Sequence, residues 1–361
     1  MKILKTSNTE IKMPKKILES ILKLKEKSNR LYIAGDTLRN LFAGNKYPVY
    51  HILTDLDKRR VCSLYNKLND DEINIKIGNY SLRIEANFNK SIEDYFSDSL
   101  FKSDMMLLDL MDETLYYNPK SIILAKNKIL SFSNNIRNRM ILCEGVLLMS
   151  IREEIENGLK LDKRSRRILK RNSSLLSVPN LSDESILEFK NILTSYYCKI
   201  IFEEYDDVLI NLFPCIDKLK YVIINKREYS NLYDKTLKVI ELCSSNIYVK
   251  VASLFINLDN AKEDNLNERR GVSGVESAFL FCKKINLSRE EIEDVCFLVE
   301  NWKLDLENYD SFKEKLKQEY RGRNFNNALN MLGELILATR RVEKEPYVDI
   351  LEYFKKVNDL E

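Results

Sequence analysis

The stretch "LYIAGDTLRN", Leu31 to Asn40, decides the fold because it joins a short apolar run, a glycine and a helical start. The apolar run predicts a strand over residues 31–34, preceded by a helix over residues 15–28. The glycine begins a turn and then a helical segment, GDTLRNLF (35–42). A helix that opens directly after a strand offers backbone N–H groups to a phosphate group. The stretch therefore predicts an α/β region with an anion site.

A second stretch, "ILTDLDKR" from Ile52 to Arg59, carries two aspartates two positions apart. We predict a strand over residues 50–57. On a strand, Asp55 and Asp57 would project from the same face, as hard oxygen ligands for the divalent cations of phosphoryl transfer. Glu85, on the polar side of a neighbouring predicted strand, offers a third carboxylate. The DxD spacing also occurs in many solvated loops, so the motif alone leaves both alternatives open.

Period-2 alternation marks further strands in the same region. Residues 73–78 and 80–88 predict a hairpin, and residues 104–119 predict another strand pair. After about residue 135 the strand signals largely vanish and helical patterns take over. The run that begins at Ser288 is typical, because Ser288 and Glu291 have the spacing of a capping box. The sequence therefore predicts an α/β head followed by a long helical body.

Composition narrows the function classes. The chain has 361 residues and a net charge of +3, a length typical of about two or three domains and a charge that points to no particular partner. Its 7 cysteines are scattered without a CxxC pair, as expected of reduced thiols in the cytoplasm. No apolar run reaches the roughly 18 residues of a membrane span, and the N-terminus lacks a signal-peptide core. The single histidine, His51, excludes a histidine-rich metal centre. The oligomeric state is not indicated.

The segment LYIAGDTLRNLFAG…TDLD resembles the opening motif VGGxVRDxLLG…DxD of the bacterial class II tRNA nucleotidyltransferases, a family that includes CCA-adding enzymes and poly(A) polymerases. Later segments keep the family's order: LRIEANF, LFKSDMML and LYYNPKSIILAKNKILSF, and then a helical run similar to an HD-type region. The resemblance covers most of the chain. It implies an α+β fold, in which a mixed-sheet nucleotidyltransferase head is followed by an elongated all-helical body and tail. The implied parts are a head (1–132), a helical neck with a basic segment (133–215), a degenerate HD-like region (216–310) and a helical tail (311–361).

The resemblance also implies roles for individual residues. Asp55 and Asp57, with Glu85 as a third carboxylate, would hold Mg²⁺, as a pair of ions, and catalyse transfer from ATP or CTP. The nucleotide would contact Gly35, Asp36, Arg39, Lys102 and Asp104, and the arginine that reads the base would be Arg137 or Arg139. The expected partner is RNA, most like the acceptor end of tRNA, and no membrane.

The sequence departs from the family pattern around the nucleotide. The Gly-Gly pair is Gly35-Asp36, the acid that follows Arg39 is Asn40, and Ser103 replaces an arginine. A carboxylate beside a triphosphate is repulsive unless a cation compensates it. No register supplies the acidic pair that reads the base, so family-type selection between C and A is not supported.

The HD-like region has lost its metal ligands. The His-Asp pair aligns with Ile256-Asn257, the GHE motif with Gly274-Val275-Glu276, and the final histidine with Trp302. Phosphohydrolase chemistry needs those ligands. We therefore predict a purely structural role for this region, with Trp302 as a packing residue.

A basic segment, KLDKRSRRILKR (160–171), predicts an RNA contact. On a helix it would be basic nearly all round, and phosphate backbones are attracted to such surfaces independently of sequence. The alternative is a solvated helix face. The cations are Lys160, Lys163, Arg164, Arg166, Arg167, Lys170 and Arg171.

Three functions remain open from the sequence. The first is Mg²⁺-dependent nucleotidyl transfer from an NTP to an RNA 3′ end, most like CCA addition to tRNA. The second is a nucleotidyltransferase with another acceptor or nucleotide, which the missing base-reading acids favour. The third is a catalytically silent RNA-binding relative, against which the retained Asp55 and Asp57 argue.

Overall fold

The computed structural model of the chain describes residues 4–7, 13–45, 49–65, 73–134, 143–227, 229–260, 273–303, 316–318, 320–322 and 324–344. The chain separates into two compact units. The head unit comprises Met1–Leu142 and Glu153–Ile168, and the body unit comprises Cys143–Arg152 and Leu169–Glu361. The finer division into head, neck, HD-like region and tail stays a prediction.

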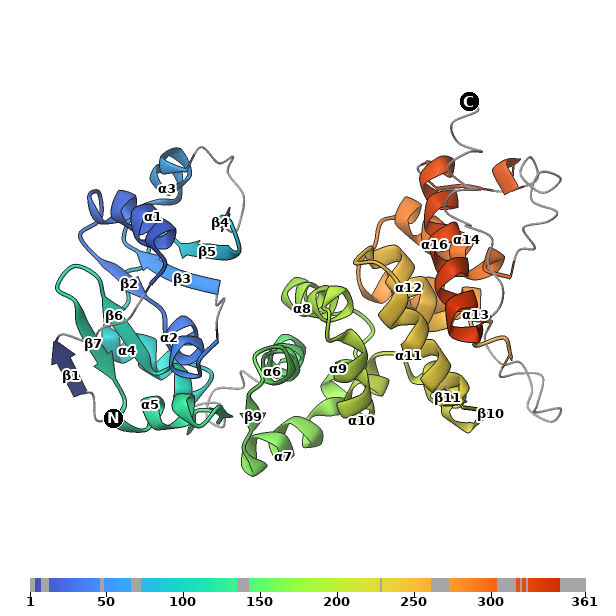
Figure 1. Cartoon of the computed structure of the whole chain (residues 1–361), viewed down its shortest axis with the longest axis horizontal. Coiled ribbons are helices and arrows are strands. Elements are labelled where there is room, and N and C mark those ends of the chain that lie inside the picture. The colour runs from blue at the N-terminus through green and yellow to red at the C-terminus, as the bar shows by residue number, and fades with distance from the viewer. Residues whose placement is uncertain are drawn as a thin grey trace. The chain divides into compact units, whose positions relative to one another are not determined.

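A mixed seven-stranded sheet forms the centre of the head unit (Figure 1). Its strand order is β1-β7-β6-β2-β3-β5-β4, and β3 pairs with β5 in parallel while the other neighbours are antiparallel. The mixed sheet predicted from the sequence is therefore confirmed. The strands are β1 (Leu4–Ser7), β2 (Leu31–Ile33), β3 (Val49–Thr54), β4 (Ile73–Ile77), β5 (Tyr80–Glu85), β6 (Met106–Asp109) and β7 (Thr114–Tyr117).

The two faces of this sheet have separate apolar cores, because successive strand residues point to opposite faces. On one face Ile33, Ile52 and Ile84 pack with apolar residues of the first helices. On the other face Leu53 and Leu107 pack with residues that include those of the fourth helix. The head helices are α1 (Lys15–Lys25), α2 (Gly35–Phe42), α3 (Lys58–Leu64), α4 (Ile92–Asp98) and α5 (Pro119–Lys126), with a 3₁₀ turn η1 (Lys102–Asp104).

One predicted boundary in the head is wrong. The strand expected over residues 50–57 ends at Thr54, and Asp55 lies in a bend. Asp57 is the N-cap of α3, where its carboxylate accepts a hydrogen bond from the Arg60 backbone N–H. Aspartate is a favoured N-cap because its side chain satisfies a helix N–H group that has no other partner. The DxD motif therefore spans a bend and a helix cap instead of one strand.

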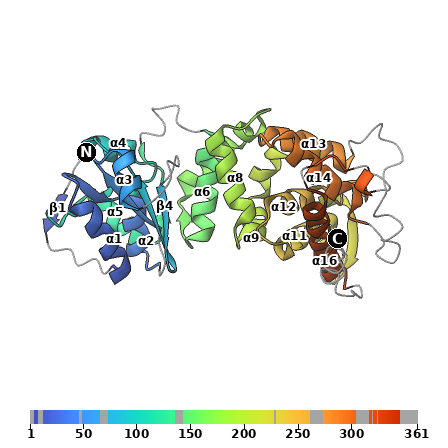
Figure 2. The same ribbon diagram turned by 90° about the horizontal axis from the view of Figure 1, so that it is seen from above.

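The body unit is predominantly helical, as predicted (Figures 1 and 2). The capping box at Ser288 and Glu291 is confirmed at the start of α14. Helix α14 packs beside α13, and α16 packs against α11 and α14. A short β10–β11 pair (Ile223–Lys226, Tyr229–Asn231) departs from an all-helical body. Helices α6 (Glu144–Glu156) and α7 (Lys163–Arg171) each have residues in both units. The main helices of the body unit are α8 (Asp183–Thr194), α9 (Cys198–Glu204), α10 (Asp206–Leu209), α11 (Leu232–Leu242), α12 (Ile247–Phe255), α13 (Gly274–Lys284), α14 (Arg289–Asn301) and α16 (Phe325–Glu343).

Aromatic side chains hold the centre of the body unit together. Phe281 of α13 contacts the rings of Phe189, Phe213 and Phe255, with ring centroids 5.4–5.5 Å apart. Such pairs add stabilisation beyond the apolar area they bury. Within the described residues, no helix combines the length and apolar character that crossing a bilayer requires.

Candidate functional site

Gly35 fixes the junction between β2 and α2. A Cβ atom at this position would lie 1.8 Å from the backbone oxygen of Asp104, so only glycine fits. The Gly35 N–H donates to the Tyr95 hydroxyl over 2.9 Å. The N–H that the sequence assigned to a phosphate therefore already has a partner, which an anion at this helix start would have to displace.

Arg39 of α2 is the centre of a buried ion-pair network. Its side chain is 1% exposed, and Nη1 donates to both carboxylate oxygens of Asp104 over 2.8 and 2.9 Å. Nη2 donates to Glu153 Oε2 over 2.5 Å. The guanidinium also lies 5.7 Å from the centre of the Phe101 ring. Arg39 and Asp104, which the resemblance assigned to the nucleotide, bond to each other, and Arg39 also bonds to Glu153 of α6.

Burial raises the pKa of the Asp104 carboxyl to about 7, and the negative charges of Asp36 and Glu153 act in the same direction. The guanidinium of Arg39 opposes this shift. The network thus places one cation against two neighbouring carboxylates in a site with little solvent. Its first consequence is structural, because it joins α2, η1 and α6 in the head unit.

Four polar side chains gather on one face of β3 and β5, beside the start of α2. We call them the His51 cluster: Asp36, His51, Arg83 and Glu85. Arg83 Nη2 lies 2.9 Å from Asp36 Oδ2, and the His51 ring nitrogens lie 3.3 Å from Asp36 Oδ1 and 3.5 Å from Glu85 Oε2. Parallel pairing of β3 with β5 places His51 opposite Arg83. The carboxylate of Asp36 is therefore compensated by protein cations.

The groups of the His51 cluster raise the pKa of the histidine. Burial acts to lower the pKa of His51, but the charge of Asp36 and hydrogen bonds to Asp36 and Glu85 outweigh it and raise that pKa. Burial would likewise raise the pKa of Asp36, but the positive charges of His51 and Arg83 lower it below its usual range. Arg83 Nη2 also lies 2.9 Å from His51 Nδ1. Arg83 Nη2 donates to Asp36 Oδ2, and Oδ1 of the same carboxylate lies 3.3 Å from His51 Nδ1.

We expect a pKa above the usual value of about 6.5 for His51. Since this is the only histidine of the chain, its ring protons can be followed by NMR without assignment. Replacing Asp36 with Asn should lower the pKa of His51 by about one to three units, the usual effect of a nearby opposite charge. Replacing the exposed Glu26 with Gln should leave it unchanged. The contribution to folding stability is complete below about pH 6.5 and is lost as the pH rises through the raised pKa. A pKa at or below 6.5 in the unmodified protein would contradict this arrangement.

Asp55 and Asp57 are bonded to separate parts of the backbone. Asp55 Oδ1 accepts from the N–H groups of Asn29 and Arg30, both over 3.1 Å, and Oδ2 accepts from the Asn29 side chain over 3.2 Å. Asp57 caps α3 and pairs with Arg60 over 3.3 Å. The third proposed ligand, Glu85, belongs to the His51 cluster.

These carboxylates do not fit a shared Mg²⁺ as they are arranged. A Mg²⁺ ion needs several oxygen ligands at about 2.0–2.1 Å in near-octahedral geometry. Among the described residues, no group of three or more His, Cys, Asp or Glu side chains is placed to hold a metal ion. Asp55 would have to exchange its bonds to Asn29 and Arg30 for a metal.

A cavity of about 420 Å³ opens beside the His51 cluster. Its charged lining residues are Lys58, Arg83 and Glu85, so cations outnumber anions, and His51 also lines it. The Arg83 Nε is buried and has no hydrogen-bond partner among the described residues. A buried donor of this kind is costly unless a ligand or water accepts from it. The cavity therefore suits an anionic group. The rest of the lining is Ile73, Ile84, Ala86 and Asn87.

Lys102, a further predicted nucleotide contact, is not among the residues that line this cavity. Lys102 lies half-buried in η1, and its backbone N–H bonds to the Ser131 carbonyl over 2.8 Å. Arg137 and Arg139 lie outside the described residues. In the HD-like region, Asn257 is fully buried and its amide donates to the Thr236 hydroxyl over 2.9 Å.

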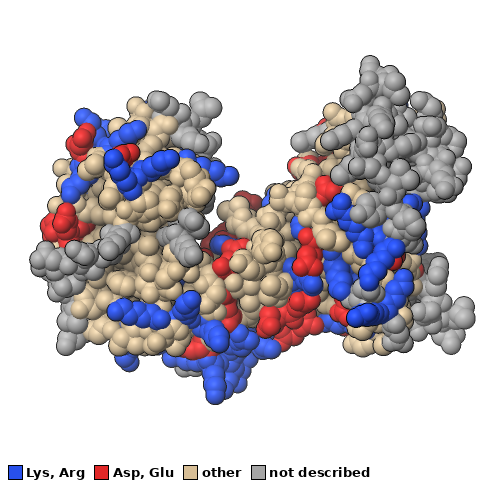
Figure 3. All heavy atoms as spheres, in the orientation of Figure 1, with Lys and Arg blue, Asp and Glu red and all other residues tan. Residues whose placement is uncertain are grey.

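The basic segment forms β9 (Lys160–Leu161) and α7, and its cations gather on the surface (Figure 3). The helix is not basic all round, because Ser165 and Leu169 are buried. Arg166 forms an ion pair with Glu154 over 2.6 Å, and Lys170 forms one with Asp207 over 2.6 Å. The exposed cations are Lys160, Lys163, Arg164, Arg167, Lys170 and Arg171.

The chain is similar to known proteins in its structure. No family model and no curated protein matches the sequence. Solved structures match along nearly the whole chain. A "tRNA-processing enzyme (apo form I)" is 17% identical with a TM-score of 0.56, over 96% of this chain and 92% of that one. A complex of CCA-adding enzyme with ATP is 16% identical with a TM-score of 0.56, over 95% of this chain and 82% of that one. The Thermotoga maritima CCA-adding enzyme complexed with tRNA_CCA is 15% identical with a TM-score of 0.53, over 95% and 82%.

The chain has the fold of CCA-adding enzymes. The predicted fold class is thereby confirmed, including the head with its mixed sheet and the helical body. Identities of 14–17% establish the fold alone.

Sequence reasoning missed the His51 cluster as a unit. It treated Asp36 as a departure from the family pattern and used His51 only to exclude a histidine-rich metal centre. One signal was available: alternation along residues 80–88 puts Arg83 and Glu85 on the same face of a strand. The partner strand and its register, which bring His51 opposite Arg83, could be seen only in the structure.

Proposed function

We propose that this protein acts at the 3′ ends of RNA, with tRNA as the leading acceptor, and transfers a nucleotide to that end from an NTP. The observation that carries the proposal is the fold, shared along 95–96% of the chain with CCA-adding and tRNA-processing enzymes. One of those structures was solved with ATP and another with tRNA_CCA. The cationic cavity of the head and the exposed cations of α7 are the features of this chain that support it.

Two surfaces would bind the two substrates, one the nucleotide and the other the RNA acceptor. The cavity beside the His51 cluster would take phosphate groups, because His51, Lys58 and Arg83 line it and the Arg83 Nε lacks an acceptor. The exposed cations of α7 would hold the phosphate backbone of the acceptor. Arg137 or Arg139 is proposed as a contact to the base.

Mg²⁺ at Asp55 and Asp57 is the part of the proposal that the observed bonds do not favour. Asp55 must first give up its bonds to Asn29 and Arg30 before it can bind a metal ion. If transfer occurs, the missing base-reading acids favour an acceptor or a nucleotide other than those of CCA addition.

The bonds of Asp55 and Asp57 favour a second candidate, binding of RNA ends without transfer. Both carboxylates have local structural roles that explain their presence without a metal. This candidate retains the RNA surface of α7 and the anion cavity. It differs from the first candidate only because no nucleotide is transferred to the bound RNA end.

A transfer assay separates the two candidates. The protein is incubated with Mg²⁺, total tRNA and each labelled NTP in turn, and a parallel reaction contains EDTA. Incorporation that EDTA abolishes supports transfer, and the identity of the added nucleotides defines its specificity. Tight tRNA binding without incorporation supports the second candidate, whereas neither binding nor incorporation contradicts both.

The role of the aspartate pair is tested in the same assay with Asp55→Asn and Asp57→Asn. Asparagine keeps one oxygen that accepts hydrogen bonds but removes the charge that a metal needs. Loss of incorporation in variants with unchanged thermal unfolding assigns a metal role to the pair. Unchanged incorporation would exclude that role.

A further inference from the structure

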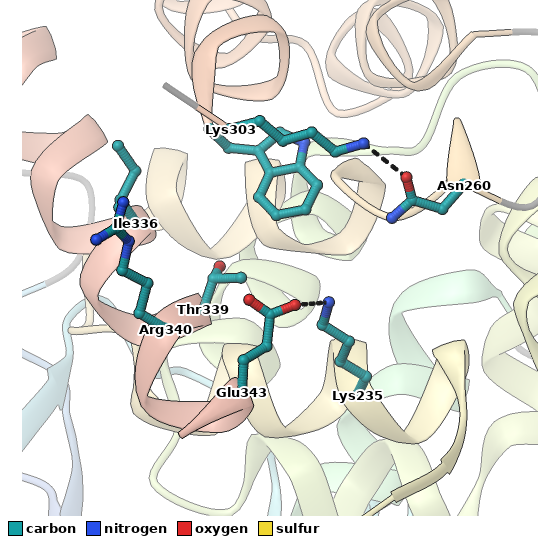
Figure 4. Close-up of a pocket in the computed structure, with 8 residues that line it drawn as sticks. Lys235, Asn260, Lys303, Ile336, Thr339, Arg340 and Glu343 are labelled. Carbon is teal, nitrogen blue, oxygen red and sulfur yellow. Dashed lines mark hydrogen bonds and ion pairs between the residues drawn. The ribbon is translucent and has the colours of Figure 1, made fainter. Parts of the chain in front are cut away.

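A second cavity, of about 290 Å³, lies within the body unit (Figure 4). Residues from α11, from the end of α14 and from α16 meet around it, although they are far apart in the sequence. Most of its lining side chains carry a charge or an amide. The lining residues are Lys235, Asn260, Trp302, Lys303, Ile336, Thr339, Arg340 and Glu343.

The charges around this cavity do not balance. Lys235, Lys303 and Arg340 are opposed by one acid, Glu343, which leaves two positive charges. The side chain of Lys235 is only 6% exposed, and its ammonium pairs with Glu343. Lys303 donates to Asn260 Oδ1 over 2.7 Å, as Figure 4 shows. The guanidinium of Arg340 forms no ion pair with any described acid. The cavity therefore favours an anion.

The cavity also has an aromatic wall. Trp302 is half-buried and follows the last residue of α14. The ammonium of Lys303 lies 5.2 Å from the centre of its ring, and that of Lys235 lies 5.8 Å away. Indole is the aromatic ring most favourable for cations. Aromatic side chains also stack with nucleic-acid bases. A tryptophan that served only as a packing residue would be enclosed by apolar side chains, and this one faces charged groups.

We propose that this cavity binds a nucleotide, with its base stacked on Trp302 and its phosphate paired with Arg340 and Lys303. The planar guanidinium can donate two parallel hydrogen bonds to phosphate oxygens. Lys235 and Glu343 neutralise each other at the floor of the site, so Arg340 and Lys303 supply the charge that attracts the phosphate. The nucleotide is either a free mononucleotide or one residue of an RNA strand. No residue of the head takes part, so the inference does not rest on the proposed transfer activity.

Trp302 is the only tryptophan of the chain, so its fluorescence reports on this cavity alone. The full-length protein is excited at a wavelength selective for tryptophan and titrated, in EDTA, with AMP, CMP, inorganic phosphate and a short single-stranded RNA. We expect AMP or CMP to quench the emission with saturation, because stacking on the ring changes its environment. Inorganic phosphate should bind more weakly by about tenfold or more, since it lacks the stacked base.

Two variants decide which groups bind. Arg340→Gln should weaken nucleotide binding by about tenfold or more, because it removes a charged donor to phosphate. The matched control is Arg341→Gln, whose exposed side chain is the next along α16 and does not line the cavity; it should bind as the unmodified protein does.

The results distinguish a free mononucleotide from a residue of an RNA strand, and some of them would contradict the proposal. Quenching by AMP or CMP identifies a mononucleotide site, whereas quenching by the RNA alone identifies a contact to an RNA strand. The proposal is wrong if neither ligand alters the emission, or if phosphate binds as well as AMP and CMP. It is also wrong if Arg340→Gln binds no more weakly than Arg341→Gln. Thermal unfolding of each variant confirms that the body unit remains folded.

Discussion

Replacing Arg39 with methionine is expected to lower the free energy of unfolding by about 3–5 kcal/mol, the usual cost of leaving a buried charge without its partner. Methionine keeps much of the side-chain volume, so the loss isolates the charge. Asp104 and Glu153 are only 14% and 17% exposed, and both bond to Arg39. Removing the cation leaves two neighbouring carboxylates that repel each other in a poorly solvated site. Denaturation in urea, followed by circular dichroism, measures the loss.

The effect of this substitution should depend on pH. The pKa of Asp104 is already raised to about 7 by burial, and it should rise further once the Arg39 charge is gone. Protonation of Asp104 then relieves the repulsion, so the loss of stability should be smaller at pH 5.5 than at pH 8. Arg60→Met, at a side chain that is 73% exposed, is the control and should change stability little. A loss of stability at Arg39 no greater than that of the control would contradict the network.

Reversing the charge of Lys163, Arg167 and Arg171 together is expected to weaken tRNA binding by about two to three orders of magnitude at roughly 0.1 M salt. These residues are four apart along α7, so they share one face of the helix. All three are exposed, and none pairs with a described acid. If each contacts one phosphate, the slope of log K against log salt should fall by about three. Filter binding over a range of salt concentrations gives both quantities.

The matched control carries the same change in net charge on other surfaces of the head unit. Lys16, Lys27 and Lys126 are exposed and lie outside the basic segment. Their replacement by glutamate tests whether the loss is due to general repulsion of RNA. An equal loss in both triple variants would mean that α7 is an ordinary solvated face.

Local patterns predicted much of the fold correctly. The strand, glycine and helix over residues 31–42 appear as β2 and α2, because the apolar run and the glycine act within a few residues. The hairpin of β4 and β5 and the capping box of Ser288 follow for the same reason. Each of these features depends on residues that are neighbours in the sequence.

The candidate site was harder to predict because its bonds join distant residues. Arg39 bonds to Asp104 and Glu153, and neither partner is visible from the segment around Arg39. The error at Asp57 was local, however. The Asp57 side chain accepts a hydrogen bond from a backbone N–H group and so caps the start of α3. The run KRRVCSL that follows Asp57 could have indicated this helix. A period-2 pattern assigns a face only if the strand continues, and β3 ends before the motif.

The central claim is that this protein recognises the 3′ end of RNA, with or without transfer to it. It is tested most directly by binding an RNA hairpin that mimics a tRNA acceptor stem with a free 3′ end. The comparison is the same stem with both strands closed by loops, so that no end is available. We expect the hairpin with the free end to bind at least about tenfold more tightly, a difference of about 1.4 kcal/mol. Equal affinity for the two RNAs would contradict the account.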